Sequence, residues 1–238
     1  MSRERRKNKT TKTIAVIVAC LMLAAVGGTI AWMTAQDSLT NQFLVGDFTD
    51  PDTDPTDPDD PLPNDPTKVN GHLYEPSWVE NSKLLPGSTI PKDPMVGIGD
   101  DSEDAYVYLY IKNNAANPDN IYFELNNEWE PVENYARVAD VADEDPAYNL
   151  GKTFYKSGLF RYKGVLDGKE GENSWTTKAF NNVYVKASAD TEGLVAAESK
   201  GTTLEVTALL HQVTSGDGTS LEGEALQWAK EQAVELAQ

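Results

Sequence analysis

The chain has very little cysteine and histidine. Of its 238 residues only Cys20 is a cysteine, and only His72 and His211 are histidines. One thiol excludes a disulfide framework within the chain. A helical zinc protease needs two histidines one turn apart with a glutamate between them, and neither histidine has these neighbours. Because a Gly-x-Ser-x-Gly nucleophile elbow is also missing, we predict that the protein is not an enzyme.

Positive charge is scarce as well. Twenty Lys and Arg residues stand against 38 Asp and Glu residues, which gives a net charge of −18. Residues 1–31 carry six of the basic residues and one Glu, so their removal would lower the net charge from −18 to −23. A protein this acidic repels nucleic acid and anionic lipid. We therefore expect no nucleic-acid partner, and membrane contact only through the N-terminal segment while it is uncleaved.

One long apolar run, Ile14 to Met33, directly follows the first basic residues. A basic region, an apolar region and small residues at its end predict a signal peptide, here residues 1–31. About 20 residues can also span a bilayer, so a retained anchor is the alternative. Small residues at positions −3 and −1 favour cleavage between Ala31 and Trp32 and hence an extracellular location. Cys20 resembles a lipoprotein cysteine, but the apolar run continues beyond it, so we interpret it as part of that run.

Two segments of contrasting composition follow the signal. Residues 32–49 form an N-terminal strand segment, in which Asn41 to Phe48 reads as a single strand. Residues 50–67 alternate aspartate with proline. Proline blocks helix and sheet and the aspartates repel each other, so this composition predicts an extended spacer of about 3.1 Å per residue, about 50 Å long.

Short segments of alternating residues fill the region 68–220. Over 105–111 apolar residues alternate with tyrosines, which indicates a strand with two apolar faces. Similar alternation recurs at 121–125, 160–162, 183–187 and 204–210. Strands this short, separated by turn signals, predict an all-β fold, an antiparallel jelly-roll-like β-sandwich.

The C-terminal region 221–238 has a different period. Its apolar residues recur at helical spacing, namely Leu226, Ala229, Ala233 and Leu236. Polar residues lie between them, so we predict a short amphipathic helix that packs on the sandwich.

Several residues could bind a ligand, although each has a simpler structural role. The tyrosine face of residues 106–110 and three tryptophans, Trp78, Trp129 and Trp175, could bind glycans, but we interpret them as packing residues. Acidic clusters at 100–104 and 143–145 could bind calcium weakly through oxygen ligands. The run from Asp50 departs from the EF-hand pattern, with no glycine at the sixth position. We therefore predict no cofactor and no dedicated metal site.

Seven short motifs occur along the chain in an order that resembles one family. They are residues 27–32 (GGTIAW), 41–46 (NQFLVG), 75–78 (EPSW), 85–94 (LPGSTIPKDP), 104–107 (DAYV), 204–208 (LEVTA) and 224–229 (EALQWA). This series resembles Gram-positive exported proteins processed by a SipW-type signal peptidase, the relatives of the biofilm fibre protein TasA and of camelysin. The aspartate-proline segment between the second and third motifs departs from the family pattern.

The resemblance implies secretion, a jelly-roll-like sandwich and assembly into fibres in which the N-terminal segment of one subunit completes the sheet of its neighbour. We therefore expect Trp32, Phe43, Leu44 and Val45 to belong to an assembly strand. The leading hypothesis is a secreted fibre subunit of the biofilm matrix or cell surface, whose partners are copies of itself or related surface proteins. Two alternatives stay open: a monomeric cell-surface binding or adhesion module, and a camelysin-like secreted metallopeptidase.

Overall fold

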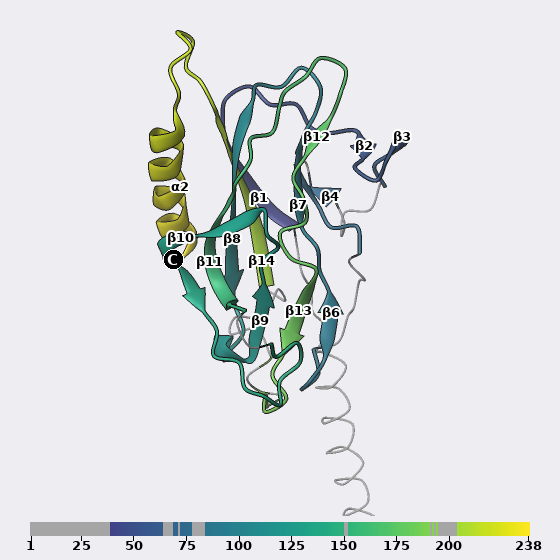
Figure 1. Ribbon diagram of the computed structural model, residues 1–238, viewed down its shortest axis with the longest axis vertical. Coiled ribbons are helices and arrows are strands. Elements are labelled where there is room, and N and C mark those ends of the chain that lie inside the picture. The colour runs from purple at the N-terminus through teal and green to yellow at the C-terminus, as the bar shows by residue number, and fades with distance from the viewer. Residues whose placement is uncertain are drawn as a thin grey trace, which may run out of the picture. The chain divides into compact units, whose positions relative to one another are not determined.

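The computed structural model describes residues 39–63, 69–70, 72–77, 84–149, 152–190, 192, 194 and 204–238. These residues form β-sheets and one C-terminal α-helix, so the predicted all-β class is confirmed (Figure 1). The predicted signal peptide, with its cleavage site between Ala31 and Trp32, lies outside the described residues.

The largest sheet contains eight strands. Their order is β1 (Leu39–Val45), β14 (Leu204–Gln212), β8 (Ala105–Asn113), β11 (Phe154–Tyr162), β9 (Ile121–Glu124), β13 (Asn182–Val185) and β6 (Thr89–Pro91), and β10 (Trp129–Val138) also pairs with β11. Within this sheet the described pairs are antiparallel, except that β1 runs parallel to β14.

The long central strand β8 is buried on both faces. Its apolar set, Val107, Leu109 and Ile111, is fully buried on one face, and Tyr106 and Tyr108 are buried on the other. The strand stops at Asn113, where the chain makes a short 3₁₀ turn, η1 (Pro118–Asn120), before β9 begins. The Asn113 side-chain amide donates to the carbonyl oxygens of Pro118 and Lys156, which ties this turn to β11.

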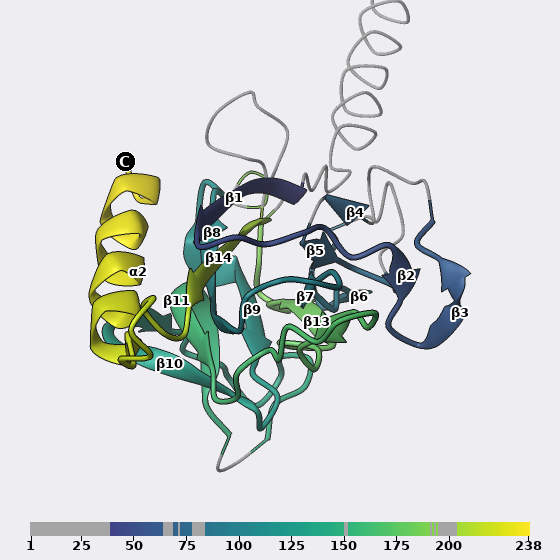
Figure 2. The ribbon, with the colours of Figure 1, turned by 90° about the horizontal axis from the view of Figure 1, so that it is seen from above.

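Two smaller sheets lie beside the large one. The first has the order β12 (Ser174–Trp175), β7 (Met95–Ile98), β5 (Leu73–Tyr74) and β4 (Val69–Asn70), and the second pairs β2 (Thr53–Asp54) with β3 (Asp57–Pro61). Strand β7 is buried along its whole length. In both ribbon views it lies on the side of the large sheet opposite to the C-terminal helix (Figures 1 and 2).

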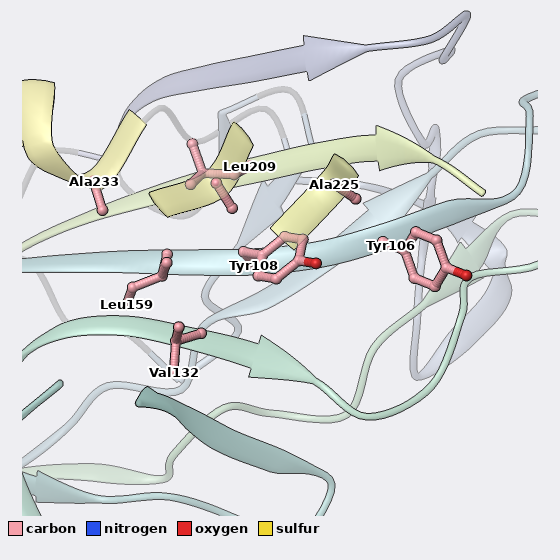
Figure 3. Packing of buried hydrophobic residues seen from close by; sticks show 8 residues of the cluster. Tyr106, Tyr108, Val132, Leu159, Leu209, Ala225 and Ala233 are labelled. Atoms are coloured by element: carbon pink, nitrogen blue, oxygen red, sulfur yellow. The ribbon is translucent and has the colours of Figure 1, made fainter. Parts of the chain in front are cut away.

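The C-terminal helix α2 (Glu222–Leu236) covers the outer face of the large sheet. Its alanines 225, 229 and 233 pack against buried residues of four strands, namely Tyr106, Tyr108, Val132, Leu159 and Leu209 (Figure 3). The predicted helix is therefore confirmed. Alanines form the centre of its contact because a small side chain lets the helix approach the bulky tyrosines, whereas Leu226 and Leu236 lie at the margin and are only partly buried.

Residues 51–61 differ from the extended spacer that the composition predicts. They form the hairpin of β2 and β3, because Asp54 at the turn accepts hydrogen bonds from Thr56 N at 2.7 Å and from the Tyr74 hydroxyl at 2.7 Å. An aspartate that bonds to a backbone N–H two residues later stabilises a turn. The start of the supposed spacer is thus folded onto the rest of the protein, and residues 64–67 lie outside the described part.

Candidate functional site

The predicted assembly strand lies at one end of the large sheet, as β1. Within the described part of the chain its backbone pairs with β14 alone, with Phe43 opposite Leu209, Leu44 opposite Leu210 and Val45 opposite His211. A strand at a sheet edge leaves one row of backbone groups without a ladder partner. Phe43, Leu44 and Val45 are therefore brought to an edge, with the Leu44 side chain 39% exposed, while Trp32 lies outside the described residues.

The strand has a partner within its own molecule. From the sequence we expected a segment available to a neighbouring subunit, and the long connection from β1 to β14 gives no local sign of the intramolecular pairing. The seam between β1 and β14 lies in a buried part of the sheet, because Val206, Ala208, Leu209 and Leu210 of β14 are buried on its two faces. Backbone N–H and C=O groups in such a place need hydrogen-bond partners. Strand β14 therefore needs a neighbour on this side, and β1 supplies it.

The pairing between β1 and β14 is short. A register shift between Leu39 and Gln42 leaves consecutive pairs only from Gln42 to Val45. Parallel pairs are slightly less stable per residue than antiparallel ones. The seam is therefore closed by a short parallel ladder at the edge of this sheet.

The other edges of the large sheet are less suited to adding a strand. Strand β6 has three residues and ends in Pro91, which cannot donate a backbone hydrogen bond. Strand β10 contains Pro131, two register irregularities and Asn134 at a φ of 67°. Such features prevent edge-to-edge pairing in natural sheets. Among the described strands of this sheet, β14 therefore has the edge that is most suited to pair with an exchanged strand.

The chain just after β1 is held differently. At Gly46 the backbone has a φ of +135°, a conformation that favours glycine. Beyond it, residues 47–50, here called the clamp segment, run beside the loop 99–103 and bond to it through the backbone. Gly46 thus lies between the strand that pairs with β14 and the segment that bonds to the loop 99–103.

A buried charged cluster joins two of the sequence motifs. The Lys92 ammonium lies 2.8 Å and 2.9 Å from the two carboxylate oxygens of Glu75, and these side chains are only 2% and 1% exposed. Next to it, the buried Asp93 accepts from Ser77 N at 2.8 Å and pairs with Lys178 at 2.7 Å. The sequence patterns did not predict this cluster; the one signal was that both motifs place charged residues beside prolines. The cluster fastens the segments around β5 and β7 together.

The two histidines lie in separate places. His72 is buried before β5, with Nδ1 2.8 Å from the Gly97 carbonyl oxygen and Nε2 3.4 Å from Asp50 Oδ1. Burial lowers the pKa of His72, and the Gly97 carbonyl and the Asp50 carboxylate partly oppose this. His211 lies on β14, with its ring 5.5 Å from the ring of Trp228. In the part of the chain that the structure describes, no three His, Cys, Asp or Glu side chains are placed to hold a metal ion.

The aromatic candidates serve mainly as packing residues. Helix α2 covers Tyr106 and Tyr108, and burial raises the pKa of Tyr108 to about 12. Trp129 is buried and donates to the Thr177 carbonyl at 3.0 Å. Trp175 is half-buried beside Tyr74, and Trp78 lies outside the described residues.

The acidic clusters stabilise loops. The buried Asp145 accepts from Ala187 N at 2.8 Å and from Ala142 N at 3.0 Å. In the cluster 100–104, Asp104 accepts from Gly168 N at 2.9 Å. These carboxylates are engaged in bonds within the fold, which agrees with their interpretation as loop residues.

The family resemblance rests on the ordered motifs. All of them except the first and the end of the third lie in described residues, and those at 41–46 and 204–208 meet at the seam between β1 and β14. Across the described residues, no helix is long and apolar enough to cross a membrane. No family model matches the chain, and no significantly similar curated protein or solved structure was found.

Proposed function

We propose that the protein is a secreted, non-enzymatic structural subunit of the cell surface or biofilm matrix, with its sheets arranged as a jelly-roll-like sandwich. Copies join when β1 of one molecule replaces β1 on β14 of the next. The observation that supports this most is the seam itself, where a short parallel strand pair closes a buried edge of an otherwise antiparallel sheet.

The exchange is nearly neutral in contact energy because the same strand pairs form in either arrangement. The donated β1 would meet Leu209, Leu210 and His211 in the register it has within one molecule. The main new cost is then the entropy of association, which a high local concentration offsets. Donor strand and acceptor seam are different surfaces, so the contact is head-to-tail and can propagate into an open fibre.

Two single-cysteine variants test the exchange directly. The chain after the predicted cleavage site contains no cysteine, and Leu44 and Leu210 are opposite each other in the register. We expect Leu44→Cys and Leu210→Cys copies, refolded together and oxidised, to form a mixed disulfide. A Val234→Cys copy, exposed on α2, replaces the Leu44 variant as the control for random collision. A mixed yield no higher than this control would show that β1 is not exchanged.

Deletion gives a second test. A chain that lacks residues 32–45 should lose the ability to polymerise, as seen by negative-stain imaging, and a synthetic peptide of residues 39–45 should bind to it. The proposal is wrong if the shortened chain forms fibres as readily as the full exported chain.

The two alternatives receive less support from the described residues. Because α2 covers Tyr106 and Tyr108, this face is not free to bind a glycan. The His72 ring faces Gly97 of β7, whereas the His211 ring meets Trp228 of α2, so the two imidazoles have different neighbours. Zinc analysis and a casein-cleavage assay on the purified protein test the metallopeptidase directly, since stoichiometric zinc with cleavage would favour it.

A further inference from the structure

We propose that Gly46 is the hinge of strand exchange and that the chain from Asp47 onward stays on its own molecule, so that joined copies meet directly at the β14 seam of the acceptor. This inference rests on the proposed function and specifies its partner surface. The partner is a second copy of this chain, because the seam is already fitted to β1.

The backbone of the clamp segment is bonded to its own molecule on alternate residues. Glu103 N donates to the Asp47 carbonyl at 3.0 Å, and Gly99 N donates to the Thr49 carbonyl at 2.8 Å. Thr49 N in turn donates to Ser102 Oγ at 3.0 Å. These bonds resemble one more strand pair, and all would be lost if the segment left with β1.

The side chains of the clamp segment are also engaged. The Phe48 ring meets the buried His72 ring edge-on at 6.4 Å between centroids, and Asp50 lies 3.4 Å from His72 Nε2. Pro51 is buried just beyond. A Cβ at Gly99 would lie 2.5 Å from the Asp50 carbonyl oxygen, so the two backbones approach as closely as glycine allows. The clamp segment is therefore packed as well as bonded.

Gly46 lies between strand β1 and the clamp segment. Before it, β1 pairs with β14, which another copy also carries, and after it the chain bonds to and packs against the loop 99–103 and His72 of its own molecule. Its φ of +135° strains any other residue, and a Cβ there would lie 2.9 Å from the Phe48 ring and 3.0 Å from Glu103 Oε2. The closed conformation of the hinge thus requires glycine, whereas a released hinge does not.

The aspartate-rich segment consequently lies outside the connection between copies. Its residues beyond Asp50 follow the clamp segment and are held on their own molecule, where Asn173 Nδ2 donates to Asp52 at 2.8 Å and the Tyr74 hydroxyl donates to Asp54 at 2.7 Å. The link between two joined copies is then Gly46 alone. A hinge this short favours exchange over folding back when its closed form is strained.

The first test is Gly46→Ala in the full exported chain. Strain in the closed hinge should raise the association constant for joined copies by about 5- to 150-fold, the range for one residue held in a disfavoured conformation. Analytical ultracentrifugation over a concentration series measures this association constant. The matched control is Gly171→Ala, because Gly171 has a φ of +77° and a Cβ there would have no other atom within 4 Å. This variant also places an alanine at positive φ, but away from the hinge, and should leave the association constant unchanged.

A second variant keeps the question answerable if Gly46→Ala fails to fold. A flexible insertion of about six Gly and Ser residues between Gly46 and Asp47 lets β1 fold back without strain, so the association constant should fall. The same insertion after Thr56, at the tip of the β2–β3 hairpin, should change nothing.

The outcomes separate the hinge from the proposed function. If the Leu44 and Leu210 cysteine copies crosslink but neither Gly46 variant alters association, exchange occurs through another hinge and this inference is overturned. A change in the association constant caused by the Thr56 insertion alone would overturn it too, because the aspartate-proline segment would then form the connection between joined copies. If the cysteine copies do not crosslink at all, both the hinge and the proposed function fail.

Discussion

Loss of one partner of the buried Lys92–Glu75 ion pair is expected to destabilise the protein strongly. The ammonium lies 2.8 Å and 2.9 Å from the carboxylate oxygens, and the two side chains are 2% and 1% exposed. In Glu75→Ala the lysine charge stays buried without this carboxylate. Breaking a buried pair in this way costs about 3–5 kcal/mol. Urea unfolding followed by circular dichroism measures the loss.

The double variant separates the charge pair from packing. Replacing Glu75 and Lys92 together by methionine removes both charges and keeps much of the volume, so the free energy of unfolding should return to within about 1–2 kcal/mol of the original value. Lys169→Ala is the control, because Lys169 and its partner Asp167 are 61% and 58% exposed, and no measurable change is expected. A loss under about 1 kcal/mol for Glu75→Ala would refute the burial argument.

Three further predictions concern the rest of the fold. Gly158→Ala should lower the free energy of unfolding by about 2–4 kcal/mol, because Gly158 has a φ of +127° and a Cβ there would overlap the Tyr135 carbonyl oxygen. An unchanged melting temperature would contradict this. Ala229→Leu adds volume to the buried contact between α2 and the sheet, so it should lower the free energy of unfolding by about 1–3 kcal/mol. Val234→Leu lies on the exposed side of α2 and should not change it. Equal effects of the two substitutions would contradict the packing of α2 on the sheet. Burial lowers the pKa of His72 below 6.5, so the unfolded chain binds the proton first and stability declines as pH falls from 6.5 toward the folded-state pKa. Urea unfolding at several pH values should show this decline and its loss in His72→Gln; an unaltered profile would exclude His72 as its source.

Local patterns predicted the parts of the fold that depend on local order. Alternation over 105–111 and 204–210 corresponds to β8 and β14, and the helical spacing after residue 221 corresponds to α2. Strand β10 escaped prediction because Pro131 and its irregular register interrupt the alternation. Strand β7 escaped because it is buried on both faces and has no polar residues to alternate with.

The candidate site was predictable only in part. The position of the apolar segment 41–48 was visible, but its parallel pairing with β14 depends on contacts across most of the chain. Glu75 and Lys92 are charged, so hydropathy places them at the surface, and only their mutual contact allows burial. The hinge at Gly46 depends on a backbone angle that no spacing encodes.

The two strands of the seam lie near opposite ends of the chain, so they become available for pairing at different times during synthesis. For a chain that emerges amino end first, β1 appears before any other described strand, and β14 follows only after residues 46–203. At about 5–20 residues per second, this interval lasts about 10–30 s. During it β1 can reach molecules that emerged earlier, while its own β14 is still to come. Under the proposed strand exchange, the rate of emergence and the local concentration of copies would then set the ratio of closed to joined molecules.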